Sequence, residues 1–98
     1  MSGARHTPRA VPPSEVERAL TDECLAPRRW SNGPGDTYAR HDHAYHKVLY
    51  CEDGSITFHT ADGDIQLDPG DRLDIEPRTV HAATVGARGV TCVEGARS

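Results

Sequence analysis

The 98-residue sequence contains no long hydrophobic run and few aromatic residues. No stretch approaches the ~18 consecutive apolar residues that a membrane-spanning helix requires, so we expect no membrane partner. The N-terminal residues include no apolar segment of the kind found in secretory signal peptides, which predicts a cytoplasmic location. Hydrophobic residues make up 36% of the chain and aromatic residues 5%, so we expect one small domain with a modest core.

Several common catalytic and cofactor-binding motifs are also missing. The chain has no G-x-S-x-G nucleophile motif, no glycine-rich phosphate loop and no C-x-x-C pair. Its three cysteines, Cys24, Cys51 and Cys92, form an odd set, so free thiols in a reducing compartment are expected. Because Cys51 and Cys92 lie in strand-like runs, we predict that both are buried core residues.

A clustered basic face is missing as well. Residues 1–30 carry five Lys and Arg against four Asp and Glu, whereas residues 31–98 carry six against eleven. The formal net charge is -4 with histidine neutral. Since nucleic-acid binding depends on grouped cations that neutralise phosphates, this acidic body argues against nucleic acid as a partner.

The N-terminal part of the chain divides into two segments. Residues 1–12 are rich in proline, arginine and small residues without periodicity, which predicts a disordered tail. Residues 13–26 are expected to form a short helix, with Ser14 as the candidate N-cap and Glu17 completing a capping box. The apolar stripe of this helix consists of Val16, Ala19 and Leu20.

Residues 27–96 are predicted to form a β domain. Apolar and polar residues alternate clearly around Ile56 and Phe58, and turn pairs occur at Asp53–Gly54 and Asp62–Gly63. Short strands separated by Gly, Pro and Asp turns are typical of an all-β sandwich or barrel. The expected strands are 47–51, 55–60, 64–67, 72–75, 80–85 and 89–94, with a further turn at 69–71.

Five of the six histidines lie between positions 41 and 81. On one strand, His41 and His43 would point to the same side, because side chains alternate between the two faces of a sheet. Two imidazoles spaced in this way suit adjacent coordination positions on a transition metal. His81 follows a turn and opens a later strand, whereas His59 is expected to face solvent beside Thr57.

The spacing around these histidines resembles the cupin family. In the first cupin motif, G-x5-H-x-H-x3,4-E-x6-G, the matching positions of this chain are Gly35, His41, His43, Lys47 and Gly54. In the second motif one glycine and the histidine match, at Gly70 and His81. The proline, second glycine and asparagine of that motif are replaced by Glu76, Arg78 and Val85. The resemblance covers about residues 29–94 and implies a cupin-type jelly-roll β-barrel with a short N-terminal helix.

The resemblance also implies a metal inside the barrel, bound by three histidines and one glutamate. Carried over, His41, His43 and His81 are the metal ligands, and Lys47 stands in the position of the glutamate. A protonated ammonium repels a cation and has no lone pair to donate. Three alternatives remain: a three-histidine site with open positions, a site in which His46 replaces the glutamate, and a metal-free site in which Lys47 anchors an acidic ligand. The metal would be a divalent transition ion, Fe, Mn, Ni, Cu or Zn.

Two classes of function follow from this site. In the first, the chain is a small metal-binding cupin that acts on or binds a small oxygenated molecule, as a metal-dependent dioxygenase or isomerase-type enzyme. In the second, it is a non-catalytic binding or sensor module without metal chemistry. Three residues are candidates to contact the small-molecule ligand: Tyr38, Tyr45 and Lys47. We also expect a homodimer, because a chain of this length buries a limited core and Trp30 opens the strand region.

Overall fold

A computed structural model of the chain describes residues 3–97 and consists mainly of β-strands. The prediction of an all-β fold with one short N-terminal helix is confirmed. In chain order the elements are strand β1 (Ala4–Thr7), the 3₁₀ helix η1 (Pro13–Glu15), helix α1 (Val16–Asp22), and strands β2 (Arg28–Asn32), β3 (Thr37–His41), β4 (His46–Thr60), β5 (Gly63–Leu67), β6 (Arg72–Ile75) and β7 (His81–Arg97).

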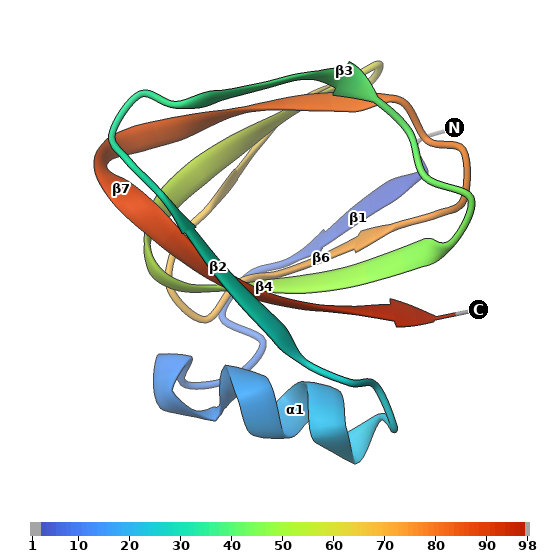
Figure 1. Ribbon diagram of the computed structural model, residues 1–98, viewed down its shortest axis with the longest axis vertical. Coiled ribbons are helices and arrows are strands. Elements are labelled where there is room, and N and C mark those ends of the chain that lie inside the picture. Colours follow the sequence, from blue (N-terminus) through green and yellow to red (C-terminus); the bar gives the residue numbers. More distant parts are fainter. Residues whose placement is uncertain (1–2, 98) are drawn as a thin grey trace.

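The strands form one antiparallel seven-stranded sheet. Its main path runs β1-β6-β4-β7-β2, while β3 pairs with β7 and β5 pairs with β4. Figure 1 looks into the ring that these strands make, with β3 and the first half of β7 facing β4 and β6 across the interior, and with α1 outside. Because strand side chains alternate between faces, every strand places one set of residues inside this barrel.

The two longest strands, β4 and β7, bend, so that each forms part of two sides of the barrel. The register between β4 and β7 shifts between Cys51 and Asp53 and again between Gly54 and Ile56. Gly54 has a φ of +76°, and a Cβ atom there would lie 2.0 Å from the carbonyl oxygen of Gly89. Asp53–Gly54 is therefore a bulge within β4, and the prediction of a hairpin turn is wrong, because pairing with β7 resumes beyond it.

The other expected strands lie within strands of the structure, except that Val80 precedes β7. The expected set did not include β2 and β3, and it ended three residues before the end of β7. The expected strands 47–51 and 55–60 are the two halves of β4, and 80–85 and 89–94 lie along β7. Residues 61 and 62 form the turn from β4 to β5, and residues 69 and 70 form the turn that leads to β6. Local turn chemistry therefore located the connections, except where a bulge replaced a turn.

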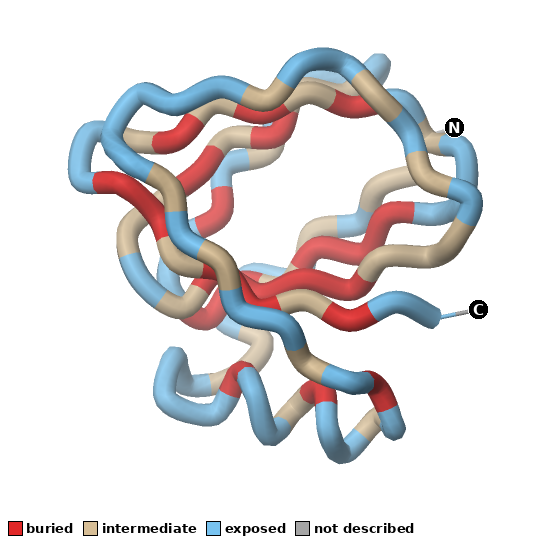
Figure 2. Tube along the Cα trace, viewed as in Figure 1, coloured by how far each residue is buried: buried red, intermediate tan, exposed pale blue. Residues whose placement is uncertain are grey.

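Two apolar clusters stabilise the fold, one on each face of the sheet. The cluster inside the barrel includes Leu49, Phe58, Leu73 and the opposed pair Cys51 and Cys92. The outer cluster joins the apolar stripe of α1 to the outward side of the sheet, and its buried members are Val16, Leu20, Leu25, Val48, Tyr50 and Val93. Figure 2 shows both as buried stretches, along the strands and on the side of α1 that faces the sheet. The helical stripe and the burial of both cysteines are as predicted.

The N-terminal segment differs from its prediction as a disordered tail. Residues 4–7 form β1, which pairs with β6. The carboxylate of Asp71 accepts a hydrogen bond from the His6 ring at 3.0 Å and another from the backbone N–H of Arg9 at 2.8 Å. The composition of residues 1–12 does not reveal that Asp71 will accept these hydrogen bonds, so it could not predict β1. Met1 and Ser2, which belong to the same predicted tail, lie outside the described residues.

The N-terminal helix is shorter than the predicted range 13–26. Regular α-helix spans only Val16–Asp22, after one turn of 3₁₀ helix. The predicted capping box is absent, because Pro12 occupies the N-cap of η1 and neither helix has a side-chain cap hydrogen bond. Across residues 3–97, no helix combines the length and the apolar character needed to cross a bilayer.

Candidate metal centre

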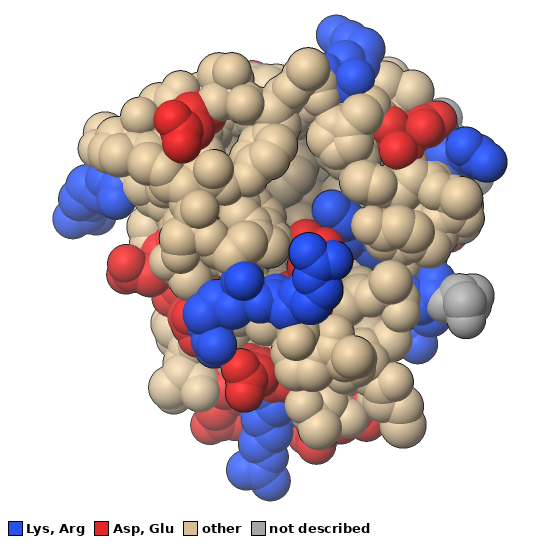
Figure 3. All heavy atoms as spheres, viewed as in Figure 1, with Lys and Arg blue, Asp and Glu red and all other residues tan. Residues whose placement is uncertain are grey.

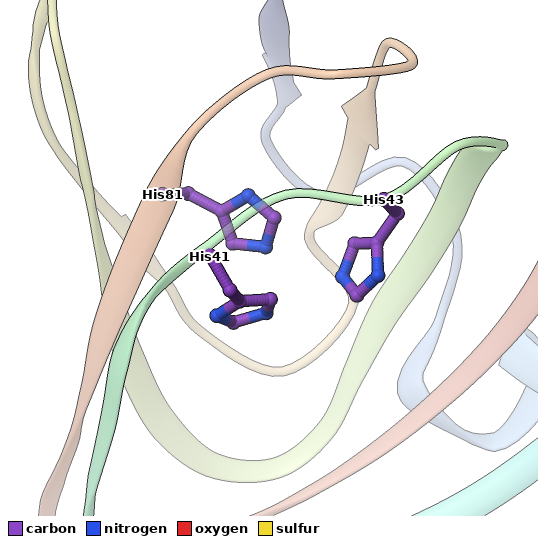
Figure 4. A group of neighbouring side chains, drawn as sticks. All are labelled: His41, His43 and His81. Carbon is purple, nitrogen blue, oxygen red and sulfur yellow. The ribbon is translucent and has the colours of Figure 1, made fainter.

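Three histidines meet at one end of the barrel interior. His41 is the last residue of β3 and lies opposite His81, the first residue of β7. His43 lies two residues beyond β3, in the segment that leads to β4. Figure 4 shows the three rings turned toward one another from these neighbouring segments. The ring centroids are 4.4–5.2 Å apart, and one nitrogen from each ring lies within 4.8 Å of the others.

Backbone carbonyls orient two of the rings. Nδ1 of His41 lies 2.6 Å from the carbonyl oxygen of Ala39, and Nδ1 of His81 lies 2.8 Å from that of Thr79. A carbonyl only accepts hydrogen bonds, so each Nδ1 carries the proton and donates it. In a neutral imidazole the lone pair then resides on Nε2, which is free to bind a cation. This arrangement, in which one ring nitrogen is held by the protein and the other is available, is typical of metal-binding histidines.

The third ring contains a buried atom without a partner. Nε2 of His43 is inaccessible to solvent and has no hydrogen-bond partner among the described residues. Burial of an unpaired polar atom costs about 1–3 kcal/mol, so such atoms are rare in folded proteins. A cation bound between the three rings would satisfy it. The donor set and this orphaned atom together fit a transition metal.

The environment keeps two of the imidazoles neutral. Burial, followed by the nearby positive charge of Lys47, lowers the pKa of His43. Burial also lowers the pKa of His81, although the hydrogen bond to the Thr79 carbonyl opposes this effect. A lowered pKa leaves the imidazole unprotonated at neutral pH, which is the form that donates a lone pair.

Lys47 lies inside the barrel and is paired with a carboxylate. Its Nζ lies 3.3 Å from Oε1 of Glu94, and the side chains of both residues are about nine-tenths buried, with 13% and 14% exposure. The same Oε1 accepts a hydrogen bond from the indole N–H of Trp30 at 2.8 Å. Glu94 therefore holds Lys47 from one side and is itself fixed by Trp30.

A cavity of about 210 Å³ lies beside the histidine cluster. Its lining combines polar and charged residues with apolar ones: Arg28, Trp30, Tyr38, His41, Lys47, Leu49, Phe58, His81, Ala83 and Glu94. A water molecule takes about 30 Å³ in the liquid, so the cavity has room for roughly seven waters or one small organic molecule. The cluster is thus accessible to a ligand of limited size.

The three residues predicted to contact a ligand, Tyr38, Tyr45 and Lys47, differ in whether they line the cavity. Tyr38 lines the cavity, and its hydroxyl donates a hydrogen bond to the side-chain oxygen of Asn32. Tyr45 packs its ring 5.1 Å from that of His43 and is not part of the cavity lining. Lys47 does line the cavity. Of the three, Tyr38 and Lys47 are therefore positioned to touch a ligand directly.

His46 is not brought to the cluster. It opens β4 one residue before the inward-facing Lys47, and its Nε2 lies 2.8 Å from Oδ1 of the buried Asp74. Its Nδ1 lies 3.7 Å from a carboxylate oxygen of Glu76. His59 is also elsewhere, since its ring bonds to Asp64 and Thr84. The alternation of side chains along β4 accounts for the placement of His46.

Glu94 is the functional residue that sequence reasoning missed. Its signal was present, because Cys92 was predicted to be buried and residues two apart on a strand share a face. Cys92 and Glu94 do share the inward face of β7, opposite Trp30 and Arg28 of β2. The partners of Glu94 come from β2 and β4, which are distant in sequence.

Comparisons with known proteins agree with this geometry. Residues 28–92 match the profile of the AraC-like ligand binding domain. Over 54 residues the chain is 44% identical to a quercetin 2,3-dioxygenase of Bacillus subtilis, a match that covers 53% of this chain and 16% of that protein. The chain therefore spans only a small part of this relative.

Solved structures share the fold at low sequence identity. A DMSP lyase from Ruegeria pomeroyi superposes with a TM-score of 0.69 and 21% identity, over 76% of this chain and 38% of that one. A cupin-2 domain protein from Shewanella frigidimarina superposes with a TM-score of 0.62 and 16% identity, over 72% and 69% of the two chains. The predicted jelly-roll barrel is thus the fold of the chain.

Proposed function

Because this chain belongs to the AraC-like ligand-binding family and is a small cupin domain, we propose that it binds one divalent transition metal through His41, His43 and His81. The observation that carries the proposal is the unpartnered buried Nε2 of His43. It lies beside two rings whose Nδ1 atoms are held by backbone carbonyls, which leaves Nε2 of each free. Three imidazole donors suit Fe, Mn, Ni, Cu or Zn, but not Mg or Ca.

A small oxygenated molecule in the adjacent cavity is the proposed ligand. A metal held by three protein ligands keeps open positions and supplies Lewis-acid or oxygen chemistry when bound. The cavity opens to one face of the barrel, Tyr38 lines its wall and Lys47 presents a cation to its interior. Tyr45 supports the site indirectly by packing on the ring of His43.

The histidine cluster and the similarity to a dioxygenase support the proposed class of reaction. That relative is named as a quercetin 2,3-dioxygenase, and we extend to this chain only the coarser reaction class, a metal-dependent dioxygenase or isomerase-type cupin. The substrate must fit about 210 Å³, which limits its size. The cavity wall formed by Leu49, Phe58 and Ala83 favours a substrate with an apolar part.

A non-catalytic ligand-binding module is the second candidate. It is favoured by Lys47, which occupies the cavity where the resemblance implies a metal-binding glutamate, and which forms an ion pair with Glu94. The matched family is also described by ligand binding rather than by a reaction. In this case the barrel would bind a small molecule without converting it.

Metal analysis of the purified protein tests the main proposal. After loading with each of the five metals and removal of excess ion, we expect about one equivalent per chain. His41→Ala and His81→Ala should lose this metal, whereas His59→Ala should keep it, because His59 bonds to Asp64 and Thr84 outside the cluster. Protein that retains none of the metals, or cluster variants that retain as much as the wild type, would exclude the proposal.

A ligand screen by thermal shift tests the second candidate. If the module binds a ligand through Lys47 without a metal, stabilisation by that ligand should persist in metal-free protein and disappear in Lys47→Ala. Stabilisation that requires metal, together with conversion of the ligand, would favour the enzymatic function instead.

A further inference from the structure

The cavity beside the histidine cluster combines apolar and charged side chains. The apolar ones include Leu49, Phe58 and Ala83, and the charged ones include Lys47 and Glu94. Leu49 lies opposite Glu94 in the register of β4 and β7, so the two kinds of side chain meet within the cavity. A ligand complementary to this lining needs an apolar part and a charged or strongly polar group. Inorganic anions, which have no apolar part, would leave the apolar side chains without a partner.

The charges of the cavity favour a negative ligand. Lys47 and Arg28 line the cavity as cations, whereas Glu94 is the only acidic lining residue among residues 3–97. Arg28 is exposed, lies opposite Glu94 in the strand register and forms no ion pair within residues 3–97. Figure 3 shows blue and red atoms together around the central hollow of this face. The cavity therefore retains one positive charge beyond what Glu94 neutralises.

Lys47 has unused donors that a ligand can reach. Its ammonium carries three N–H groups, and Glu94 is its only ionic or hydrogen-bonded partner among the described residues. The side chain of Lys47 is 13% exposed, so a bound anion would meet it largely shielded from water. Charge-assisted hydrogen bonds are stronger in such surroundings than at an open surface.

Glu94 has a defined position relative to this ammonium. Trp30 donates to Oε1 of Glu94, and the same oxygen faces Lys47. Oε2 has no partner within the described part of the chain. The carboxylate is thus anchored in the place that a ligand carboxylate would seek, and it competes with that ligand for Lys47.

We propose that this cavity binds a small organic carboxylate whose charge pairs with Lys47 and whose apolar part lies against Leu49, Phe58 and Ala83, and that Glu94 is an internal competitor that limits the affinity. This proposal rests on the proposed function and specifies its ligand, because the carboxylate would occupy the cavity next to the metal-binding histidines. Glu94 is a specificity-determining residue in this account, since its charge disfavours ligands with a second negative group.

Matched pairs of ligands test the proposal in the wild-type protein. Benzoate and benzamide have nearly the same shape but differ in charge, and butyrate and butyramide form a second pair. Isothermal titration of the zinc-loaded protein should show that each carboxylate binds about tenfold or more tightly than its amide, as a charge-assisted pair predicts. Equal affinity for carboxylate and amide in both pairs would overturn the proposal.

Two variants separate the roles of the charged residues. Lys47→Met keeps most of the length of the side chain without its charge, and should reduce the preference for carboxylates to the part that zinc contributes. Glu94→Gln retains an oxygen that can accept from Trp30 and should tighten carboxylate binding about three- to tenfold, because the competing charge is gone. Arg88→Met removes a cation that does not line this cavity and should change neither the preference nor the affinity. An undiminished preference in Lys47→Met, or weaker binding in Glu94→Gln, would contradict the assignment.

The same titrations in metal-free protein distinguish this proposal from the metal site. A carboxylate also binds a metal directly, so part of its affinity should disappear without zinc, whereas the part lost in Lys47→Met should remain. If the protein binds no metal but still prefers carboxylates through Lys47, the proposed function fails and the carboxylate subsite stands. If metal binds and the preference is independent of Lys47, the metal site stands and the carboxylate subsite fails.

Discussion

At the scale of single residues, the site depends on how each imidazole is held. Two of the rings are oriented by carbonyls two residues before them, at Ala39 and Thr79, so the chain positions these ligands locally. The third ring, His43, lies in a connecting segment and packs against Tyr45. The sequence analysis placed His41 and His43 on one strand, but β3 ends at His41, so the placement of His43 depends on how the chain leaves β3.

Lys47 is the residue that most distinguishes this site from the four-ligand cupin pattern. Burial is the main cause that lowers the pKa of both His43 and His81, and the positive charge of Lys47 lowers it further. The same charge disfavours a cation bound between the rings. We predict that Lys47→Met binds zinc about three- to tenfold more tightly than the wild type, since the repulsion is removed while the three imidazoles remain. Competition with a chromophoric chelator measures this affinity. A weaker zinc affinity in Lys47→Met would show that the ammonium supports the site instead of opposing metal.

Residue-level prediction from sequence succeeded where a motif carried the information. The two cupin motifs identified the histidines that meet in space. His46 had remained an alternative ligand, and the structure places it against Asp74, away from the cluster. Glu94 was missed because its role depends on Trp30 and Lys47, two residues from other strands. Pairings across a sheet are not encoded in local patterns, so a single sequence does not reveal them.

At the scale of elements, Asp71 joins the N-terminal strand to the body of the barrel. Burial would raise the pKa of Asp71, but the backbone N–H groups of Arg9 and Asp68 and the His6 ring together lower it. The folded state therefore favours the charged carboxylate. Its stabilising contribution is present above the ordinary pKa of 3.8 and is lost as the pH falls through the lowered value.

We predict that Asp71→Asn lowers the free energy of unfolding by about 1–3 kcal/mol at pH 7, because charged hydrogen bonds at β1 and the 68–71 turn are weakened. The difference between variant and wild type should begin to shrink below about pH 4, where the carboxylate of the unfolded chain becomes protonated, and should be lost once the pH falls through the lowered pKa of the folded state. Urea unfolding at several pH values measures both effects. A difference that stays constant down to pH 2.5 would contradict the assigned linkage.

Helix α1 is stabilised by its packing on the outer face of the sheet, since a helix of seven residues is not stable alone. Leu20 is fully buried there against Val48, Tyr50 and Val93. We predict that Leu20→Ala lowers the free energy of unfolding by about 2–4 kcal/mol, as expected for a cavity in a packed core. The exposed neighbour Thr21→Ala should change it by less than about 0.5 kcal/mol. Similar values for both variants in urea unfolding would show that α1 does not contribute to the cooperative unit.

Element positions were predictable mainly from turns and alternation. Residues 61–63 and 69–71 marked real connections because their turn chemistry is local. The bulge at Gly54 and the strand β1 were not predictable, because each depends on a partner far along the chain, Gly89 in one case and Asp71 and β6 in the other. Sequence patterns thus located segments better than they located their long-range partners.

At the scale of the whole molecule, the chain is a barrel with one wall covered by a helix. Val80, at 44% exposure, is the only large hydrophobic side chain classed as exposed within residues 3–97. The predicted homodimer therefore has no broad apolar face available on the described surface and would use a polar interface or the edges of strands. The helix within residues 13–26 shares its core with β4 and β7 of the predicted β domain, residues 27–96.

We predict a dimer by multi-angle light scattering at micromolar concentrations, with dissociation on dilution that reflects a modest interface. Strand edges pair through backbone groups, so the interface would tolerate many single side-chain substitutions. A monomeric mass at all concentrations up to 1 mM would show that the thin core is sufficient without a partner.

The central claim is that three imidazoles from β3, from the segment after it and from β7 bind one metal ion inside the barrel. Anomalous diffraction from a crystal of the zinc-loaded protein, collected on both sides of the zinc absorption edge, tests this claim most directly. The account predicts one strong anomalous peak within about 2.0–2.2 Å of a ring nitrogen from each of His41, His43 and His81. A zinc-loaded crystal with no peak among these rings, or with its zinc bound only elsewhere, would contradict it.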